Sequence, residues 1–595
     1  MQFNEQQLKA INHFEGPCAV IAGAGSGKST VLVKRIETLI QKGVAEYEIM
    51  AISFTKATAE DLKKKLNAKG ILNVNVGTFH SILGRMLYQN GINVYNTVPP
   101  FEVQKAFNKI QYGAEIDDIL SFISYQKCFM KSYNDVFVAK ESAYTNTELS
   151  LYFEEYEKLK RSKNAYDFDD WLIKAYELLC SRPGIIRPKY LLVDEHQDSN
   201  MVQNKLIEQL CPSRNIFVVG DYRQSIYGFR GAVPKYFMNF SKIYPDATII
   251  NLDYNYRSAK QIVERSNKFM KQYYGNYEHY SDSISTSDKN GEITFEWYED
   301  EFDMAEDIAN HIGNLTTFMD VEPKDIAILF RNNAQAAEME MSLMKRKIPY
   351  DLESDGNFFA SKQILPIVSM LRLLKNREDD EAYANIVKTR CMPFTFLSKQ
   401  SFIEVERMAA LQNISYVNAS MMVPVNSNQQ NMLATFTQKL NFLENQVRIG
   451  TNLIELIENI IVTLDLRSFV GQKFHSSEEK EARLKSFETL KMFAKTYTLD
   501  GFLKFLASGS TGNNKKKNEN SIKMMTIHKS KGLEFKHVFV IGLKENTFPS
   551  EKADITEEAR LFYVAVTRPI EALHLRQIGQ TNCFVQQYFK KEGTK

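Results

Sequence analysis

The chain has 595 residues, of which 44% are hydrophobic and 25% are charged. At roughly 100 to 200 residues per domain this length predicts about three to five domain-sized units, and the composition excludes a wholly disordered chain. Lys plus Arg number 74 against 72 Asp plus Glu, so a net charge of +2 excludes a strong overall attraction to nucleic acid or membrane, and any anion site must be local.

Six cysteines are scattered along the chain without a C-x-x-C pair. This distribution argues against a zinc ribbon, an iron–sulfur cluster or a disulfide framework, and it predicts reduced thiols in a cytoplasmic protein. No run approaches the roughly 18 consecutive apolar residues of a membrane span, so we expect no membrane partner.

Short apolar runs in the first half of the chain have the length and composition of buried strands. Several precede amphipathic stretches such as KSTVLVKRIETLIQKG at 28–43, an alternation typical of a parallel sheet covered by helices. This pattern predicts an α/β core made of residues 1–85 and 185–255. The expected strands lie at 19–25, 49–55, 190–195, 215–221 and 247–252.

A second group of apolar runs predicts a second α/β core, made of residues 256–375 and 521–595. Its expected strands lie at 325–330, 521–527 and 536–543. The remaining segments, 86–184 and 376–520, are mostly rich in Leu, Phe, Tyr, Lys and Glu at three- and four-residue spacing, which is typical of helices. Each core is therefore predicted to carry a mainly helical insertion.

The stretch AGAGSGKS follows the first expected strand and opens the first expected helix. Backbone N–H groups of a glycine-rich turn and of a helix N-terminus can surround a polyphosphate. The strict P-loop pattern G-x-x-x-x-G-K-[ST] has glycine where this chain has Ala22. Lys28 adds a charge for the β- and γ-phosphates, and the Ser29 hydroxyl suits Mg²⁺. The expected phosphate-binding residues are Ala22, Gly23, Ala24, Gly25, Ser26, Gly27, Lys28 and Ser29.

Two adjacent carboxylates, Asp194 and Glu195, end the expected strand YLLVDE. They lie at the carboxyl edge of the predicted sheet, where the P-loop also lies. We expect Asp194 to serve the metal and Glu195 to serve the attacking water. The neighbouring His196 lacks partner ligands and is interpreted as structural.

Further motifs follow in order along the chain: AISFTKATAEDL, VGTFHS, VDEHQD, VVGDYRQSIYGFRGA, LDYNYRS, MMTIHKSKGLEF and EEARLFYVAVTR. With FNEQQ and AGAGSGKS before them, they resemble the UvrD/Rep/PcrA-type helicases of superfamily 1 over nearly the whole chain. The family's own P-loop variant accounts for Ala22. The resemblance implies two RecA-like P-loop NTPase cores, with parallel sheets flanked by helices, that close on one nucleotide.

The resemblance also implies roles for individual residues. Gln224 would sense the γ-phosphate, and Asp194 and Glu195 would hold the metal and activate the water. Arg257 and Arg568 resemble two arginine fingers, since a planar, permanently charged guanidinium can neutralise the transferring phosphoryl group. The implied contacts with the base and the ribose come from Gln7, Arg35, Tyr256 and Glu534.

Tyr227, Phe229 and Arg230 follow Gln224 within a few residues, so a phosphate sensor and a base-stacking platform would share one loop. Without the family context, packing in an ordinary core is the more frequent role of such rings. Phe229 stands where the family usually has tryptophan. By resemblance, Phe54 and His80 complete a track for single-stranded DNA, and His528 relays between the two sites.

We therefore expect an ATP-dependent DNA helicase that uses ATP and Mg²⁺ and moves 3′ to 5′ on single-stranded DNA, the polarity being implied by the resemblance. It would unwind duplex DNA or displace bound protein in replication, repair or recombination. The expected partners are single-stranded DNA and single/double-strand junctions, and the expected state is a nucleoid-associated monomer in the absence of DNA. The alternative is a nucleotide-gated DNA-binding subunit of a repair or phage-defence assembly, without processive unwinding. Residues 388–402 lack the Gly-rich hairpin that family members use against duplex DNA.

Overall fold

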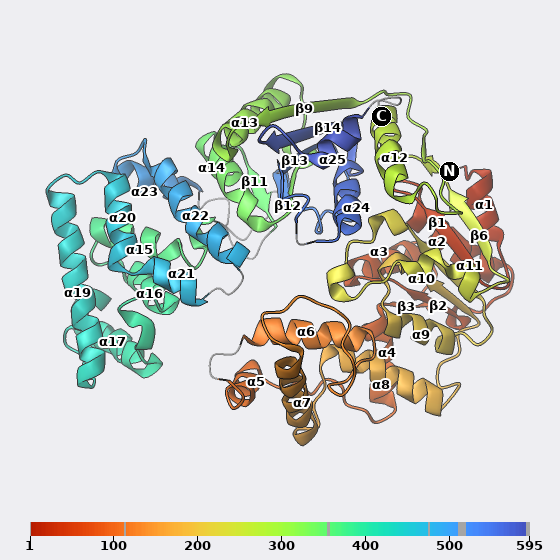
Figure 1. Ribbon diagram of the computed structural model, residues 1–595, viewed down its shortest axis with the longest axis horizontal. Helices are drawn as coiled ribbons and strands as arrows, with labels where there is room; N and C mark the ends of the chain where they lie inside the picture. Colours follow the sequence, from red (N-terminus) through yellow and green to blue (C-terminus); the bar gives the residue numbers. More distant parts are fainter. Residues whose placement is uncertain are drawn as a thin grey trace.

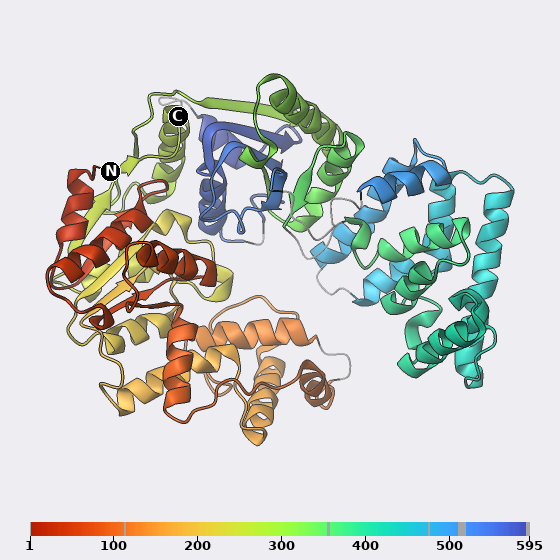
Figure 2. The same cartoon turned by 180° about the vertical axis from the view of Figure 1, so that it is seen from behind.

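The computed structural model describes residues 2–111, 115–353, 358–473, 477–509, 519–551 and 553–590. Two parallel β-sheets flanked by helices lie next to each other, and each has a helical body beside it (Figures 1 and 2). The fold class predicted from the sequence, two α/β cores with parallel sheets, is confirmed.

The first sheet has six parallel strands in the order β3-β2-β4-β5-β1-β6. Every residue of β1, β2, β4 and β5 is buried, which explains their continuous apolar sequences. The five predicted strands are all present, and β3 is an addition. The strand bounds are β1 (Cys18–Ala22), β2 (Ile49–Ile52), β3 (Asn75–Gly77), β4 (Tyr190–Val193), β5 (Ile216–Gly220) and β6 (Thr248–Leu252).

Helices cover both faces of this sheet, as parallel strands require. Helix α2 starts at Lys28, immediately after the glycine-rich turn, so its N-terminus lies at the carboxyl edge of the sheet. The helices of this core are α1 (Glu5–Asn12), α2 (Lys28–Gln41), α3 (Lys56–Asn67), α4 (Phe79–Gln89), α9 (Met201–Leu210), α10 (Lys235–Met238) and α11 (Phe240–Ile243).

The second sheet also has six parallel strands, in the order β11-β12-β10-β13-β14-β9. The three predicted strands correspond to β10, β12 and β13. The strand bounds are β9 (Glu292–Tyr298), β10 (Ile326–Phe330), β11 (Tyr350–Leu352), β12 (Ile522–Thr526), β13 (Phe535–Lys544) and β14 (Pro569–Ile578). The flanking helices are α12 (Lys260–Tyr274), α13 (Glu301–Phe318), α14 (Ala337–Lys345), α24 (Ile555–Val566) and α25 (Cys583–Phe589), and a small ribbon joins β7 (Tyr254–Asn255) to β8 (Ile284–Ser285).

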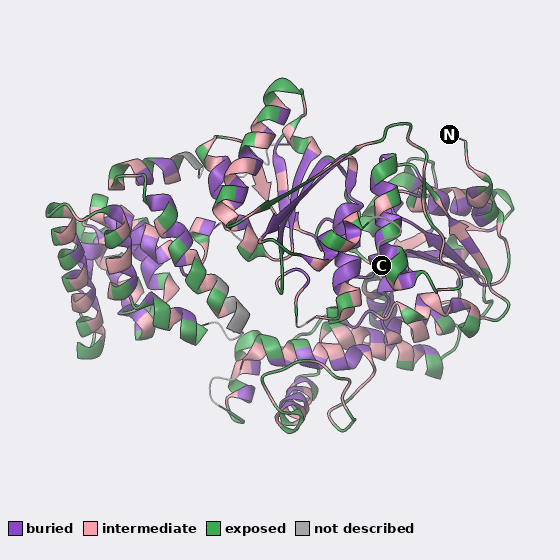
Figure 3. Cartoon of the chain, turned by 45° about the horizontal axis from the view of Figure 1, so that its top comes forward, coloured by how far each residue is buried: buried purple, intermediate pink, exposed green. Residues whose placement is uncertain are grey.

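The second helical body lies beside the second sheet, and buried residues lie on the inner faces of its helices (Figure 3). Their apolar side chains form a core of their own. This core includes α15, which lies upstream of residue 376, the predicted start of the insertion. In the segment 388–402 the structure has turns, a short 3-10 helix and the start of α17, and it has no hairpin there. The helices are α15 (Leu365–Lys375), α16 (Asp380–Thr389), α17 (Lys399–Gln412), α18 (Tyr416–Ser420), α19 (Ser427–Arg448), α20 (Leu453–Thr463), α21 (Leu466–Lys473), α22 (Ser477–Ala494) and α23 (Leu499–Gly509).

The first helical body joins α4 to β4, and a buried ion cluster holds its helices together. The ammonium groups of Lys127 and Lys160 lie among the carboxylates of Glu157, Asp167 and Asp170, at distances of 2.5 to 2.8 Å. The two lysine side chains are only 4% and 3% exposed. The helices are α5 (Pro100–Phe107), α6 (Ile116–Cys128), α7 (Asn146–Ser162) and α8 (Phe168–Ser181).

A Lys160→Met variant is expected to destabilise this body by about 3 to 5 kcal/mol, because it leaves three partly buried carboxylates around one buried ammonium group. The matched control is Lys158→Met on the same helix, whose exposed pair with Glu154 contributes little to stability. Hydrogen exchange of the α6–α8 amides measures the stability of this body in both variants. Equal protection in the two variants would contradict the stabilising role of the cluster.

Across the described ranges, no helix has both the length and the apolar content that crossing a membrane requires.

Candidate functional site

The glycine-rich turn between β1 and α2 forms a cradle of backbone. Gly25 and Gly27 have φ angles of +70° and +81°, a backbone region that residues with a side chain rarely adopt. A Cβ atom on Gly25 would lie 2.7 Å from the Cβ of Arg257. The Ser26 hydroxyl is buried and has no hydrogen-bond partner among the described residues. Because this turn also leads into the N-terminus of α2, it fits a polyphosphate.

The two predicted carboxylates lie at the neighbouring strand end, beside Lys28. The Lys28 Nζ atom is 3.2 Å from Glu195 Oε1, and the Glu195 N–H donates to Asp194 Oδ1 at 3.0 Å. Burial and the charge of Glu195 raise the pKa of Asp194 to about 7. Burial alone would raise the pKa of Glu195, but the charges of Lys28 and Lys531 lower it to about 2. Asp194 and Ser29, the second residue of α2, carry the carboxylate and hydroxyl oxygens that Mg²⁺ prefers.

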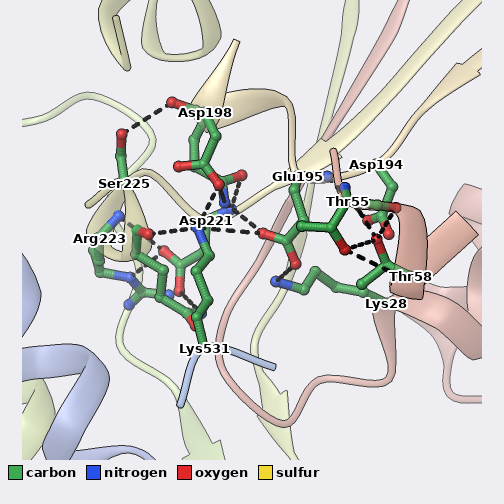
Figure 4. A network of polar contacts seen from close by, with 12 residues as sticks. Lys28, Thr55, Thr58, Asp194, Glu195, Asp198, Asp221, Arg223, Ser225 and Lys531 are labelled. Atoms are coloured by element: carbon green, nitrogen blue, oxygen red, sulfur yellow. Dashed lines mark hydrogen bonds and ion pairs between the residues drawn. The ribbon is translucent and has the colours of Figure 1, made fainter. Parts of the chain in front are cut away.

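Lys531 of the second core reaches into this group of first-core residues (Figure 4). Its Nζ atom is 3.9 Å from Glu195 Oε2, donates to the Gln224 carbonyl at 2.8 Å, and pairs with Asp198. The sequence analysis did not single out Lys531. The only signal available there was its place in MMTIHKSKGLEF.

Arg568 meets the first core through Gln224. Its Nη2 group donates to Gln224 Oε1 at 2.9 Å, while the Gln224 amide donates to Asp221 Oδ2 at 2.8 Å. Burial and the charge of Arg257 lower the pKa of Arg568 to about 9, so it remains cationic near neutral pH. An unbroken path of polar contacts therefore runs from Lys28 through Glu195, Lys531 and Gln224 to Arg568.

Residues predicted to meet the base and the ribose surround the same turn. The Gln7 amide donates to the Ser26 carbonyl at 3.1 Å, and the Tyr256 N–H donates to the Gly25 carbonyl at 2.9 Å. Tyr256 is 50% exposed. Glu534 accepts from Arg257 Nε at 2.7 Å. The roles of these residues toward a nucleotide stay predictions.

The predicted base contact of Arg35 is wrong. Arg35 is 1% exposed, and its Nη1 group donates to the carbonyls of Ala10 and His13. Its guanidinium lies 4.1 Å from the centre of the Phe217 ring, and burial lowers its pKa to about 10. Arg35 therefore ties α2 to α1 and β5, away from any nucleotide on the turn.

Four of the rings predicted to bind DNA form one cluster. Tyr227 stacks on Phe54 with the ring centres 5.2 Å apart, and its centre lies 6.1 Å from that of Phe229. The His528 ring lies 5.6 Å from Phe229, and Arg230 lies over both Tyr227 and Phe229. Phe229 is 52% exposed. Because Tyr227 is three residues from Gln224, this cluster adjoins the polar path.

His80 belongs to a neighbouring group of rings. It stacks on Phe168 with the ring centres 3.6 Å apart and an angle of 9° between the planes. Phe168 was not singled out from the sequence, although it is 59% exposed. Phe54 and His80 follow β2 and β3, which pair in register, so the two ring groups lie along one edge of the sheet.

Helix α24 of the second core contacts the loop that carries Tyr227 and Phe229 at one end and leads to Arg568 at the other. Near its first turn, Glu557 Oε1 accepts the Gly228 N–H at 3.0 Å. A Cβ atom on Gly228 would lie 2.7 Å from the Glu557 carboxylate, so a side chain at this position would displace that carboxylate. One rigid element thus links the ring-bearing loop to Arg568.

A Glu557→Ala variant is expected to lose much of the stimulation of ATP hydrolysis by single-stranded DNA, while keeping the basal rate. The reason is that the Gly228 N–H loses its partner, so the ring-bearing part of the loop is held less firmly to α24, although Arg560 still donates to the Ser225 carbonyl. Glu557→Gln keeps an acceptor oxygen and is the matched control. Steady-state ATPase rates with and without oligo-dT measure the effect, and full stimulation in the alanine variant would rule out this link.

Comparison with known proteins places the chain in a family. Residues 3–245 match the UvrD/REP helicase N-terminal domain, and residues 250–578 match the UvrD-like helicase C-terminal domain. The chain belongs to the UvrD-like helicase family. The boundary between the two family domains, between residues 245 and 250, falls at the start of β6, the last strand of the first sheet along the chain.

Relatives in this family cover nearly the whole chain. The chain is 31% identical to "ATP-dependent DNA helicase PcrA" of Bacillus subtilis (strain 168), over 99% of this chain and 85% of the relative. It is 30% identical to the PcrA protein of Leuconostoc citreum, over 98% and 82% of the two chains, and 29% identical to that of Staphylococcus aureus (strain Mu50), over 96% and 82%. The family membership predicted from the ordered motifs is confirmed, and these relatives favour the helicase over the alternative of a nucleotide-gated subunit.

Proposed function

We propose that this UvrD-like helicase is an ATP-dependent DNA motor that moves 3′ to 5′ on single-stranded DNA. The contact path from Lys28 to Arg568 carries the proposal, because it crosses from one core to the other and adjoins exposed aromatic rings. The three relatives described above are all named ATP-dependent DNA helicases.

In this proposal ATP is shared by the two cores. Lys28 and the glycine-rich turn bind the phosphates from the first core, and Arg568 and Arg257 approach from the second. Ser29 and Asp194 would hold Mg²⁺, which neutralises charge on the phosphates. Glu195, held close to Lys28, orients and deprotonates the attacking water.

Hydrolysis removes the contacts of the γ-phosphate and so weakens the closed arrangement of the cores. Gln224 contacts Arg568 through its side chain and Lys531 through its carbonyl, and it lies three residues before Tyr227. Separation of the two cores therefore changes the position of the ring cluster relative to Arg568 and Lys531. A grip on DNA that differs between two states is what a stepping motor needs.

The proposed substrates are single-stranded DNA and single/double-strand junctions, and the proposed cellular role is duplex unwinding or protein displacement in replication, repair or recombination. We place the protein in the cytoplasm with the nucleoid, as a monomer in the absence of DNA. The described part of 388–402 has no hairpin for duplex DNA, so unwinding would depend on the translocating strand.

The decisive experiment measures ATP hydrolysis with and without single-stranded DNA, followed by strand separation on duplexes with a 3′ or a 5′ tail. We expect DNA-stimulated hydrolysis and separation of the 3′-tailed duplex alone. Stimulated hydrolysis with neither separation of a duplex nor displacement of bound protein would favour the alternative of a nucleotide-gated subunit. Separation of the 5′-tailed duplex alone would refute the polarity.

A further inference from the structure

A strip of aromatic side chains continues from His80 and Phe168 along the first helical body. The Trp171 ring lies 5.4 Å from Phe168, the Tyr95 ring lies 5.1 Å from Trp171, and the Tyr88 ring lies 6.0 Å from Tyr95. The outer aromatic strip is defined here as Trp171, Tyr95 and Tyr88. No role in the proposed motor has yet been given to it.

Local sequence on α4 fixes the direction of this strip. His80, Gly84 and Tyr88 are spaced four residues apart and lie on one face of the helix. Gly84 leaves room for Trp171 to pack against the helix, since a Cβ atom there would lie 2.8 Å from the indole ring. From His80 to Tyr88 the distance along α4 is therefore about 12 Å at 1.5 Å per residue.

Two of the three rings of the strip are open to solvent, while Trp171 is half-buried against α4. Tyr88 is 61% exposed and Tyr95 is 54% exposed, beside the 59% exposed Phe168. Exposed aromatic groups that adjoin one another mark binding surfaces, whereas single exposed rings do not. Arg85, an exposed cation on the same helix, adds positive charge next to the strip.

The position of the strip beside His80 and Phe168 indicates which ligand it binds. His80 follows β3, the strand that pairs with β2, and β2 leads into Phe54 of the ring cluster. The strip thus begins next to the edge along which the proposed function places single-stranded DNA. Successive bases stack on aromatic side chains in sequence-independent tracks of this kind.

We infer that the outer aromatic strip is an additional binding site for unpaired bases, which extends the single-strand track from His80 onto the first helical body. The inference rests on the proposed function, since it needs a strand that already passes Phe54 and His80. It assigns DNA contacts to Trp171, Tyr95 and Tyr88. It also predicts a longer occluded site than the Tyr227 cluster alone would give.

The chain offers a direct reporter, because Trp171 and Trp297 are its two tryptophans. In a Trp297→Phe background, oligo-dT of increasing length is titrated against the fluorescence of Trp171. We expect quenching to begin only at lengths that extend past the Tyr227 cluster, and affinity to rise over the same lengths. No quenching at any length, with hydrolysis still stimulated by DNA, would overturn the inference and leave the proposed function standing.

A Tyr88→Ala/Tyr95→Ala variant in the same background tests the site by loss. We expect its affinity for long oligo-dT to fall by about fivefold or more, and its affinity for short oligo-dT and its hydrolysis stimulated by short oligo-dT to stay unchanged. The control is Tyr47→Ala, a 78% exposed ring at the amino end of β2, on the opposite edge of the sheet.

The possible outcomes separate the two proposals. Unchanged affinity for long oligo-dT in the double variant would overturn the inference, and this is the result that a strip serving a protein partner predicts. An equal loss for short and long strands would also overturn it, because the defect would then be general. If the parent protein neither binds oligo-dT of any length nor hydrolyses ATP faster with it, the proposed function fails and the inference fails with it.

Discussion

A Lys28→Ala variant is expected to hydrolyse ATP about 10²- to 10³-fold more slowly than the parent and to lose strand separation. Its binding of DNA should be retained. Lys28 is the first residue of α2 and lies at the end of the glycine-rich turn, with its side chain 16% exposed. It supplies the positive charge that stabilises the β- and γ-phosphates as negative charge shifts in the transition state. DNA-stimulated ATPase rates measure the effect.

The fold should tolerate this change. The substitution removes the ion pair between Lys28 and Glu195, but Glu195 still has the Lys531 ammonium 3.9 Å away as a second partner. Lys34→Ala on the same helix, whose ammonium pairs with Glu37, is the matched control and should leave hydrolysis unchanged. If the Lys28→Ala variant keeps its DNA-stimulated hydrolysis, the phosphate site has been assigned to the wrong turn.

An Arg568→Lys variant is expected to keep nucleotide affinity within a few-fold and to lose about 10³-fold or more in the rate of hydrolysis. Three nitrogens of the Arg568 guanidinium donate to Val564, Leu533, Gln224 and Thr567. An ammonium group cannot reproduce this planar arrangement, nor spread its charge over a transferring phosphoryl group. Single-turnover hydrolysis and equilibrium binding of a nucleotide analogue measure the two effects separately.

The separation of rate from binding distinguishes this arginine from Lys28. A defect confined to folding would lower affinity and rate together, and hydrogen exchange of α24 would detect it. Arg265→Lys, which replaces a partly buried arginine of the same core that contacts the Tyr588 carbonyl, is the control. A normal rate of hydrolysis in the Arg568→Lys variant would exclude this side chain as an arginine finger.

The α/β cores could be predicted from the sequence because their central strands are buried on both faces. Runs such as those in β1, β5 and β10 are continuously apolar, which sets them apart from helices and loops. β9 was missed because it lies at the edge of its sheet and most of its residues are exposed or half-buried. β14 was missed because it buries His574 and Arg576, polar residues that hydropathy places outside a core.

The glycine-rich turn and the strand-end carboxylates could be predicted because their chemistry is local. Each depends on a strand, a turn and a few consecutive residues. Lys531 could not be found in this way, since its partner Asp198 is 333 residues away in the chain. Contacts over such separations are set by how the two cores pack against each other.

The position of Arg35 on α2 explains why the predicted base contact was wrong. Val31, Arg35 and Leu39 are spaced four residues apart on α2, and all three are buried. The helical period of the apolar residues places Arg35 on the face that packs against the sheet. Hydrophobic periodicity therefore outweighs motif proximity as an indicator of where an arginine points.

The central claim is that one nucleotide is held by Lys28 from the first core and by Arg568 from the second. The most direct test is a crystal structure of the protein with Mg²⁺ and a non-hydrolysable ATP analogue. We predict that the Lys28 ammonium and the Arg568 guanidinium both lie within about 3 Å of oxygens of the same triphosphate. A triphosphate bound at Lys28, with Arg568 facing a separate cavity, would contradict the account.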